Sequence, residues 1–180
     1  MPNSNRSLGV YVKTANPDSV NDTTLYRGGE LGVAYDFNDR AYQVVQLDSG
    51  VIASTGPGVV AANQLAFWKE RAKYLVTNDP AQAKLGGVTN SYANNVAGIF
   101  RVAATSGNYV HILQRGRNIA VKEAGSAAGG MSLEATPSAT TAGATGVAVG
   151  TQNSYQKLGV VHTATAANVC YADVDIPNIP

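Results

Sequence analysis

Apolar residues occur along the chain in short runs that are separated by turn-forming residues at regular intervals. Turn signals such as RGG, DSG, TGPG and SGN alternate with runs rich in Val, Ile, Leu, Tyr and Thr. Such runs are too short for stable helices and are typical of strands joined by tight turns. The pattern predicts an all-β protein, either a small β-barrel or a jelly-roll-like sandwich. Local periodicity does not distinguish the two, because it does not encode strand order.

The sequence NQLAFWKERAKYL, residues 63–75, also fits a helix. Its apolar side chains recur at helical spacing, at Leu65, Trp68, Ala72 and Leu75. The runs LAFW and YLVT are β-prone, however, and the polar residues between them would suit a turn. We therefore favour a hairpin over a helix for this segment.

A similar order of residues occurs three times, beginning at Leu31, Ala97 and Leu158. Each copy has a small or apolar residue, a glycine, two apolar residues, a polar turn and then a β-prone run. We expect each copy to form the same kind of hairpin, in which the glycine admits a neighbour that a side chain would exclude. The three glycines are Gly32, Gly98 and Gly159. Coincidental similarity among β-rich segments is the alternative interpretation.

The two ends of the chain differ from the predicted core. Residues 1–24 are polar and rich in turn formers, apart from a short apolar patch at Leu8, Val10 and Val12, which predicts an extended N-terminal arm that orders against a partner. Residues 25–180 are expected to form a single β-domain. The last residues, ADVDIPNIP, contain two prolines and predict a short extended C-terminal tail.

Residues 124–156 are composed mainly of Ala, Gly, Thr and Ser, with Glu134 as their only charged side chain. A flexible linker is one interpretation of this composition. The sequences MSLEAT and GVAVGT keep β-type alternation, so we favour strands of small residues joined by wide loops.

Charge changes the range of functions to consider. Charged residues make up only 14% of the chain and the net charge is +1, whereas an average soluble domain has about 25% charged residues. The absence of a basic surface argues against nucleic acid as a partner. No apolar run approaches the roughly 20 residues of a membrane-spanning helix, and the N-terminus lacks the layout of a secretion signal, so we expect no membrane and synthesis in the cytoplasm.

Catalytic and metal-binding patterns are weak. The chain has one cysteine, Cys170, which we expect to be buried, and two histidines, His111 and His162, which both fall within predicted strands. Neither histidine lies in a nucleophile motif, and no set of ligands has the spacing of a zinc, calcium or phosphate site. We expect no metal, no cofactor and no enzymatic activity.

Two groups of charged residues could instead indicate a catalytic site or a nucleic-acid-binding surface. Asp36 and Asp39 are close in sequence, as are Asp173 and Asp175. Asp173 and Asp175 would share one strand face and resemble a carboxylate pair, but a solvated strand edge explains them better. Three arginines near Tyr109 resemble a nucleic-acid surface only faintly, and we favour a hairpin with arginines at its tips: Arg101, Arg115 and Arg117.

Residues 42–79, 94–117 and 158–178, taken in order, resemble the capsid decoration or cement proteins of tailed bacteriophages. The similarity extends from about Leu31 to Pro177 and rests on the order of short phrases. It implies a mostly-β protein on the outer surface of the virion, commonly a homotrimer, that clamps neighbouring major capsid protein subunits. It also implies an N-terminal arm that pairs with a capsid strand.

We therefore expect a structural virion protein that stabilises contacts between major capsid subunits. The alternative is a glycan-binding β-sandwich displayed on a virion or cell surface, with Trp68, Tyr74 or Tyr109 as a stacking platform. An enzyme with a β-fold has only the aspartate pair in its favour. The candidate interface residues are Leu8, Val10, Val12, Phe67, Trp68, Tyr74, Phe100 and Tyr109.

Overall fold

The computed structural model describes residues 20–21, 33–35, 40–49, 58–82, 84–85, 88–89, 95–123, 127–135, 148–150 and 156–176. Strands dominate this part of the chain, which confirms the predicted all-β class. The only helical turns in it are the 3₁₀ turns η1 (Arg71–Lys73) and η2 (Pro80–Gln82). The strands are β1 (Val20–Asn21), β2 (Val33–Tyr35), β3 (Ala41–Leu47), β4 (Val59–Val60), β5 (Leu65–Glu70), β6 (Leu75–Thr77), β7 (Lys84–Leu85), β8 (Val88–Thr89), β9 (Val96–Phe100), β10 (Ala104–Thr105), β11 (Tyr109–Lys122), β12 (Ser132–Ala135), β13 (Ala148–Gly150), β14 (Lys157–Ala166) and β15 (Val169–Asp175).

Five strands close into a β-barrel in the order β3, β6, β5, β9 and β11, and β11 pairs back onto β3. β3 and β6 are parallel, with Gln46 opposite Leu75, whereas the other pairs around the barrel are antiparallel. Closure leaves these five strands with partners on both sides. The barrel alternative of the sequence analysis is therefore confirmed.

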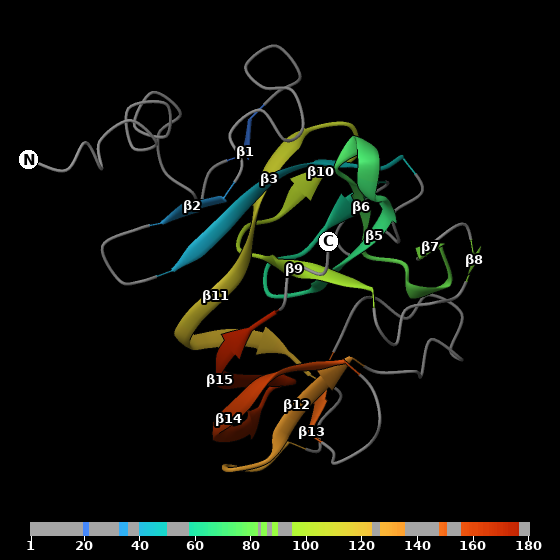
Figure 1. The fold of residues 1–180 in the computed structure, drawn as a ribbon. Coiled ribbons are helices and arrows are strands. Elements are labelled where there is room, and N and C mark those ends of the chain that lie inside the picture. Colours follow the sequence, from blue (N-terminus) through green and yellow to red (C-terminus); the bar gives the residue numbers. More distant parts are fainter. Residues whose placement is uncertain are drawn as a thin grey trace, which may run out of the picture.

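Strand β11 belongs to the barrel and also to a second sheet (Figure 1). Its first residues pair with β3, and from Arg115 to Lys122 it pairs with β15. Beyond β15 the second sheet continues through β14 and β12 to β13. The pairing with β15 shifts between Gly116 and Ile119, where Asn118 has a positive φ of 51°. This bulge gives β11 a local bend and extra twist as it passes from the barrel to the second sheet.

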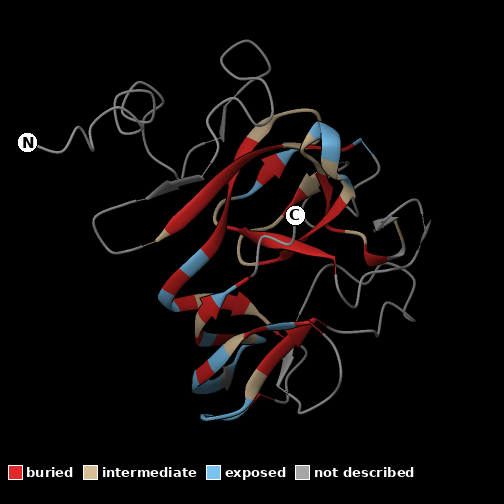
Figure 2. Ribbon diagram, viewed as in Figure 1, coloured by how far each residue is buried: buried red, intermediate tan, exposed pale blue. Residues whose placement is uncertain are grey.

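Two hydrophobic clusters support this arrangement (Figure 2). One joins the barrel to the β4–β10 pair, through Val60 and Ala104, and includes Ala66 and Trp68 of β5. The other joins the barrel to the second sheet and includes Leu65 and Phe67, the alternate residues of the same strand. Strand β5 is therefore buried on both faces, and each large apolar side chain buried in this way contributes about 1.5–3 kcal/mol.

The segment 63–75 forms a hairpin, as favoured from the sequence. β5 and β6 pair antiparallel around η1, and Tyr74 ends that turn with a positive φ of 53°. A helix would bury a single stripe of these residues, whereas the strand buries Leu65 and Phe67 on one side and Ala66 and Trp68 on the other. Burial on both faces explains why the helical spacing misleads.

Each of the three similar stretches contains an antiparallel pair: β2 with β3, β9 with β11, and β14 with β15. Gly98 and Gly159 sit where neighbouring backbones approach closely. A Cβ atom would lie 2.8 Å from the Leu113 carbonyl oxygen at Gly98, and 1.8 Å from the Asp173 carbonyl oxygen at Gly159. The proposed reason for these two glycines is therefore confirmed, whereas Gly32 lies outside the described residues.

The segment rich in small residues also forms strands where it is described. MSLEAT contains β12 and GVAVGT contains β13, and the two pair antiparallel with Leu133 opposite Gly150. Most of the expected N-terminal arm, including Leu8, Val10 and Val12, lies outside the described residues. Within it, β1 pairs with the start of β11. The chain beyond Ile176 is also outside the described part.

Candidate functional site

The second sheet presents one face to the core and the other to solvent. Along β15 the side chains of Ala172 and Val174 point into the core, so the alternate residues lie on the opposite face. We call this solvent-exposed surface the outer face. Its members on β11, β12, β14 and β15 are Arg115, Arg117, Ser132, Val160, His162, Tyr171, Asp173 and Asp175.

The Asp173 carboxylate connects three neighbouring strands of the outer face. Its Oδ2 atom lies 2.8 Å from Nε2 of His162 on β14, and its Oδ1 atom accepts the backbone N–H of Asn118 on β11 at 2.9 Å. Both donors lie at shifts in strand register, because β14 shifts between Val161 and Thr163 and β11 shifts around Asn118. One carboxylate therefore holds two bulges in place.

These contacts change the acidity of Asp173. Hydrogen bonding from His162, followed by that from the Asn118 N–H, lowers the pKa of the Asp173 carboxyl below its ordinary value, with a smaller effect from the charge of Arg117. A general acid requires a raised pKa. The lowered pKa keeps Asp173 ionised at neutral pH, as the acceptor of both hydrogen bonds.

Asp175 lies on the same face as Asp173, as predicted from the sequence, and Oδ1 of Asp175 is 3.9 Å from Nε of Arg115. Both side chains of that pair are largely exposed, so the contact adds little stability. The two aspartates thus make separate contacts, each with its own basic neighbour. The strand edge favoured from the sequence is wrong, because β15 pairs with β11 on one side and β14 on the other. Arg115 and Arg117 lie within β11, so the expected position at a hairpin tip is wrong for both, whereas Arg101 follows the end of β9.

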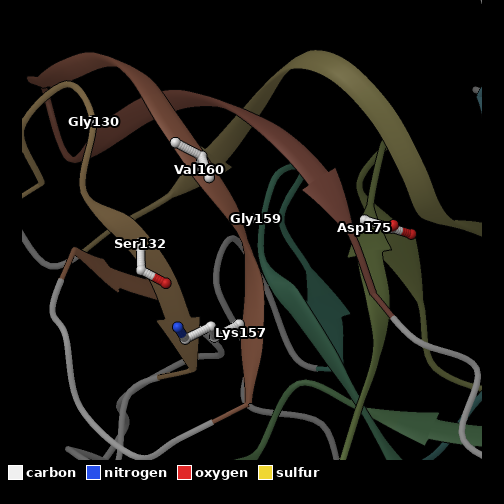
Figure 3. A pocket seen from close by; sticks show the side chains of 6 residues that line it. All are labelled: Gly130, Ser132, Lys157, Gly159, Val160 and Asp175. Carbon is white, nitrogen blue, oxygen red and sulfur yellow. The ribbon is translucent and has the colours of Figure 1, made fainter.

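Two open hollows flank Val160 on the outer face. The first, of about 590 Å³, is bounded on the β12 side by Gly130, Ser132 and Lys157. Figure 3 shows Ser132 and Lys157 beside one another on neighbouring strands, with Val160 farther along β14. The second, of about 490 Å³, extends toward β11, where Arg117 lines it. Val160, Gly159 and Asp175 line both hollows, and we call the exposed Val160 side chain the ridge.

Apolar side chains are exposed in the same region. Val160 is 51% exposed, Tyr171 is 44% exposed and Met131, just before β12, is 37% exposed. In the described part of the chain, these three are the large apolar side chains that are exposed. Two of them lie on adjacent strands, β14 and β15, so the outer face combines apolar and charged groups.

The candidate interface residues of the barrel lie elsewhere. Phe67 and Phe100 are completely buried, and Trp68 is almost completely buried, so all three belong to the core of the folded chain. Tyr74 packs edge-on against Trp68 with ring centroids 6.3 Å apart, and it is partly buried, as is Tyr109. Of the described residues on that list, only the two tyrosines retain any surface for a partner.

Trp68 is enclosed by its neighbours. The guanidinium of Arg71 lies 5.4 Å from the centre of its ring, and burial lowers the pKa of Arg71. Because Trp68 is buried beneath Arg71 and Tyr74, it cannot offer a flat face to a sugar. Of the three residues proposed to stack against a glycan, Trp68 is therefore excluded.

The two histidines and the cysteine differ in their surroundings. His111 is buried in β11, whereas His162 is exposed on β14. Cys170 is buried, as predicted, and burial together with the charge of Glu123 raises the pKa of its thiol to about 11. Asp36 and Asp39 lie outside the described residues.

Among the residues that the structure describes, no group of His, Cys, Asp and Glu side chains is arranged to hold a metal ion. Within the same part of the chain, no helix has the length and hydropathy needed to span a membrane. Comparison with known proteins found no family model and no curated protein that matches the sequence.

The outer face was only partly visible in the sequence. The alternation in VCYADVD places Tyr171, Asp173 and Asp175 on one strand face, and this was the available signal. The contribution of Val160 and His162 depends on the register of β14 against β15, which includes two shifts. Local periodicity does not predict such shifts.

Proposed function

We propose that the chain is a structural virion protein that binds the outside of a tailed-bacteriophage head and stabilises contacts between major capsid subunits. The order of phrases in the sequence supports this proposal, as does the all-β fold. The observation that carries it is the outer face: an ordered sheet surface on which Asp173 fixes two bulges while apolar Val160 and Tyr171 stay exposed.

Such a surface suits a protein partner. Large apolar side chains exposed beside charged groups are typical of recognition surfaces. A face held by cross-strand contacts loses little conformational entropy when it binds, so more of the interaction energy remains as affinity. A small ligand would instead prefer an enclosed cavity, whereas both hollows are open.

The proposed role follows from linkage. A protein that binds the assembled shell but not its separate subunits shifts the equilibrium toward the shell. A specific interface commonly buries about 1,600 Å² in total, and many copies on one shell multiply the effect. No catalytic activity is required for this role.

The N-terminal segment and self-association complete the proposal. β1 shows that part of this segment can add to a sheet edge, since Val20 pairs with Val110. The preceding residues would add in the same way to an exposed strand of the major capsid protein. We further propose a homotrimer on the virion surface, in which each copy contacts the shell.

Binding to shells tests the proposal. Empty heads of the bacteriophage proposed to encode this chain would be mixed with purified protein and sedimented. We expect saturable co-sedimentation and a higher temperature of shell disassembly when the protein is bound. Absence of binding across the micromolar range, or turnover of a substrate by the pure protein, would contradict the proposal. Binding to a glycan array in place of shells would favour the alternative.

A further inference from the structure

We propose that the ridge at Val160, with the hollows on either side of it, is the docking site for an acidic segment of the shell protein. Arg117 and Lys157 would be its cationic contacts. The inference rests on the proposed function, because it names which part of the chain meets the shell and the chemistry of the segment that it meets.

The shape of the outer face suits a partner segment that runs across β14. The two hollows share Gly159, Val160 and Asp175; the first continues toward β12 and the second toward β11. Three glycines, Gly116, Gly130 and Gly159, line them and contribute no side chains. Side chains of an extended partner can therefore enter both hollows while its backbone passes over the ridge.

Among the described residues, some charged side chains around the hollows already have partners, and others do not. Asp173 already holds His162 and the Asn118 N–H, and Asp175 faces Arg115. Lys157 and Arg117 are both exposed, and neither forms a salt bridge with any carboxylate in the described part of the chain. Arg117 acts on Asp173 only as a nearby charge. Lys157 at the first hollow and Arg117 at the second thus remain for a partner. With Arg115, the two linings together contain three cations against the two carboxylates, Asp173 and Asp175.

The cations without salt-bridge partners favour one kind of binding partner over the others. A carboxylate reaching Lys157 or Arg117 gains an opposite charge, and an apolar residue beside it covers the half-exposed Val160. A second copy of the outer face would have to supply carboxylates that already have partners of their own. A neutral sugar would leave both cations without a counter-charge. An acidic segment that also carries an apolar residue matches all three features.

The test compares single charge reversals in the full chain, using assembled shells as the probe. Arg117→Glu and Lys157→Glu alter the site, and Lys73→Glu makes the same change in charge on η1, where Lys73 pairs with Glu70 2.8 Å away. We expect each site variant to weaken shell binding about tenfold at low salt, and the control to stay within about twofold. Arg117→Lys and Lys157→Arg should retain most of the affinity.

Salt provides a readout that a change in folding would not reproduce. Wild-type affinity should fall as sodium chloride rises, and this dependence should be weaker in Arg117→Glu and Lys157→Glu, whose melting temperatures should match that of Lys73→Glu. Val160→Ser should weaken binding at every salt concentration.

The outcomes separate the two proposals. If the wild type does not bind shells at all, the proposed function fails. If it binds and the site variants bind equally well, the shell is held by another surface and the inference fails alone. If the site variants change the oligomeric state in solution and shell binding only as a consequence, the ridge is a contact between copies, and the acidic segment is excluded.

Discussion

The imidazole Nε2 atom of His162 lies 2.8 Å from Oδ2 of Asp173, across the β14–β15 pair. The same carboxylate accepts the Asn118 N–H from β11, so this side chain connects three strands at points where the ladder is irregular. A contact of this kind sets the shape of a surface even though its exposed ion pair contributes little to stability.

The link predicts a specific acid dependence. Because the pKa of Asp173 is lowered in the folded chain, its contribution to stability is complete above the unfolded pKa of about 4 and is lost as the pH falls through the folded value. Asp173→Asn should therefore flatten the dependence of unfolding free energy on pH in this acid range. Urea denaturation at several pH values would measure it, with Asp175→Asn as the matched control on the same strand. Equal flattening in both variants would contradict the prediction.

Gly159→Ala should strongly destabilise the second sheet. The added Cβ would lie 1.8 Å from the Asp173 carbonyl oxygen, so β14 and β15 would have to separate. We expect a loss of about 3 kcal/mol or more in unfolding free energy. Gly107→Ala is the control, because its Cβ would meet no atom within 4 Å and only its positive φ would be strained, at a cost nearer 1 kcal/mol. Similar losses in the two variants would show that crowding at Gly159 is unimportant.

Phe67 and Phe100 should matter for stability and not directly for binding. Both rings are fully buried, so truncation to Ala should cost about 3–5 kcal/mol in unfolding free energy. Phe67→Leu and Phe100→Leu keep enough volume to fold and should bind shells with wild-type affinity per folded molecule. Tyr109→Phe changes a partly buried residue that retains some exposed surface, so it is the comparison variant for a side chain that could contact a partner. Loss of binding by a stable Phe→Leu variant would reinstate that side chain as a contact residue.

Cys170 should be unreactive in the folded chain. Burial, with the charge of Glu123, raises the pKa of its thiol to about 11, so almost no thiolate is present at pH 8. A thiol-specific reagent should label it slowly in buffer and rapidly after unfolding in guanidinium chloride. Labelling at equal rates in both conditions would contradict the buried position.

Gln43 and Gln114 should show strong coupling inside the barrel. The amide Nε2 of Gln114 donates to Oε1 of Gln43 at 2.7 Å, and both side chains are buried. Changing either residue alone to Leu should cost about 1–3 kcal/mol, because the remaining amide loses this short hydrogen bond, and Gln114 keeps only the longer one, 3.4 Å, to the Ala97 carbonyl oxygen. The double variant should cost less than the sum of the single variants. A double-mutant cycle from urea denaturation measures this, and strict additivity would argue against the pair.

The sequence predicted local structure better than long-range structure. The turn signals and short β-prone runs identified the strands, and the glycine repeat pointed to Gly98 and Gly159, whose backbones do approach their neighbours closely. The parallel pairing of β3 with β6 and the return of β11 to β3 depend on residues distant in sequence. These pairings decide between barrel and sandwich, and no local pattern encodes them.

The aromatic residues illustrate a second limit. Phe67 and Trp68 are neighbours on one strand, so their side chains point to opposite faces, and in an ordinary surface strand one of them would be exposed. Here β5 lies between the two hydrophobic clusters, and both side chains are covered. Composition and alternation identify such residues as important but cannot show whether the second face is covered by the rest of the chain.

Strand β11 runs unbroken from the barrel into the second sheet, and this continuity has a mechanical consequence. A pull applied at the outer face passes along a single stretch of backbone into a closed ring of strands, with no flexible hinge between them. Strands loaded along their length resist by sharing the strain over many backbone hydrogen bonds at once. In the proposed shell-binding role, this arrangement would distribute a load on the outer face over the strands of the barrel.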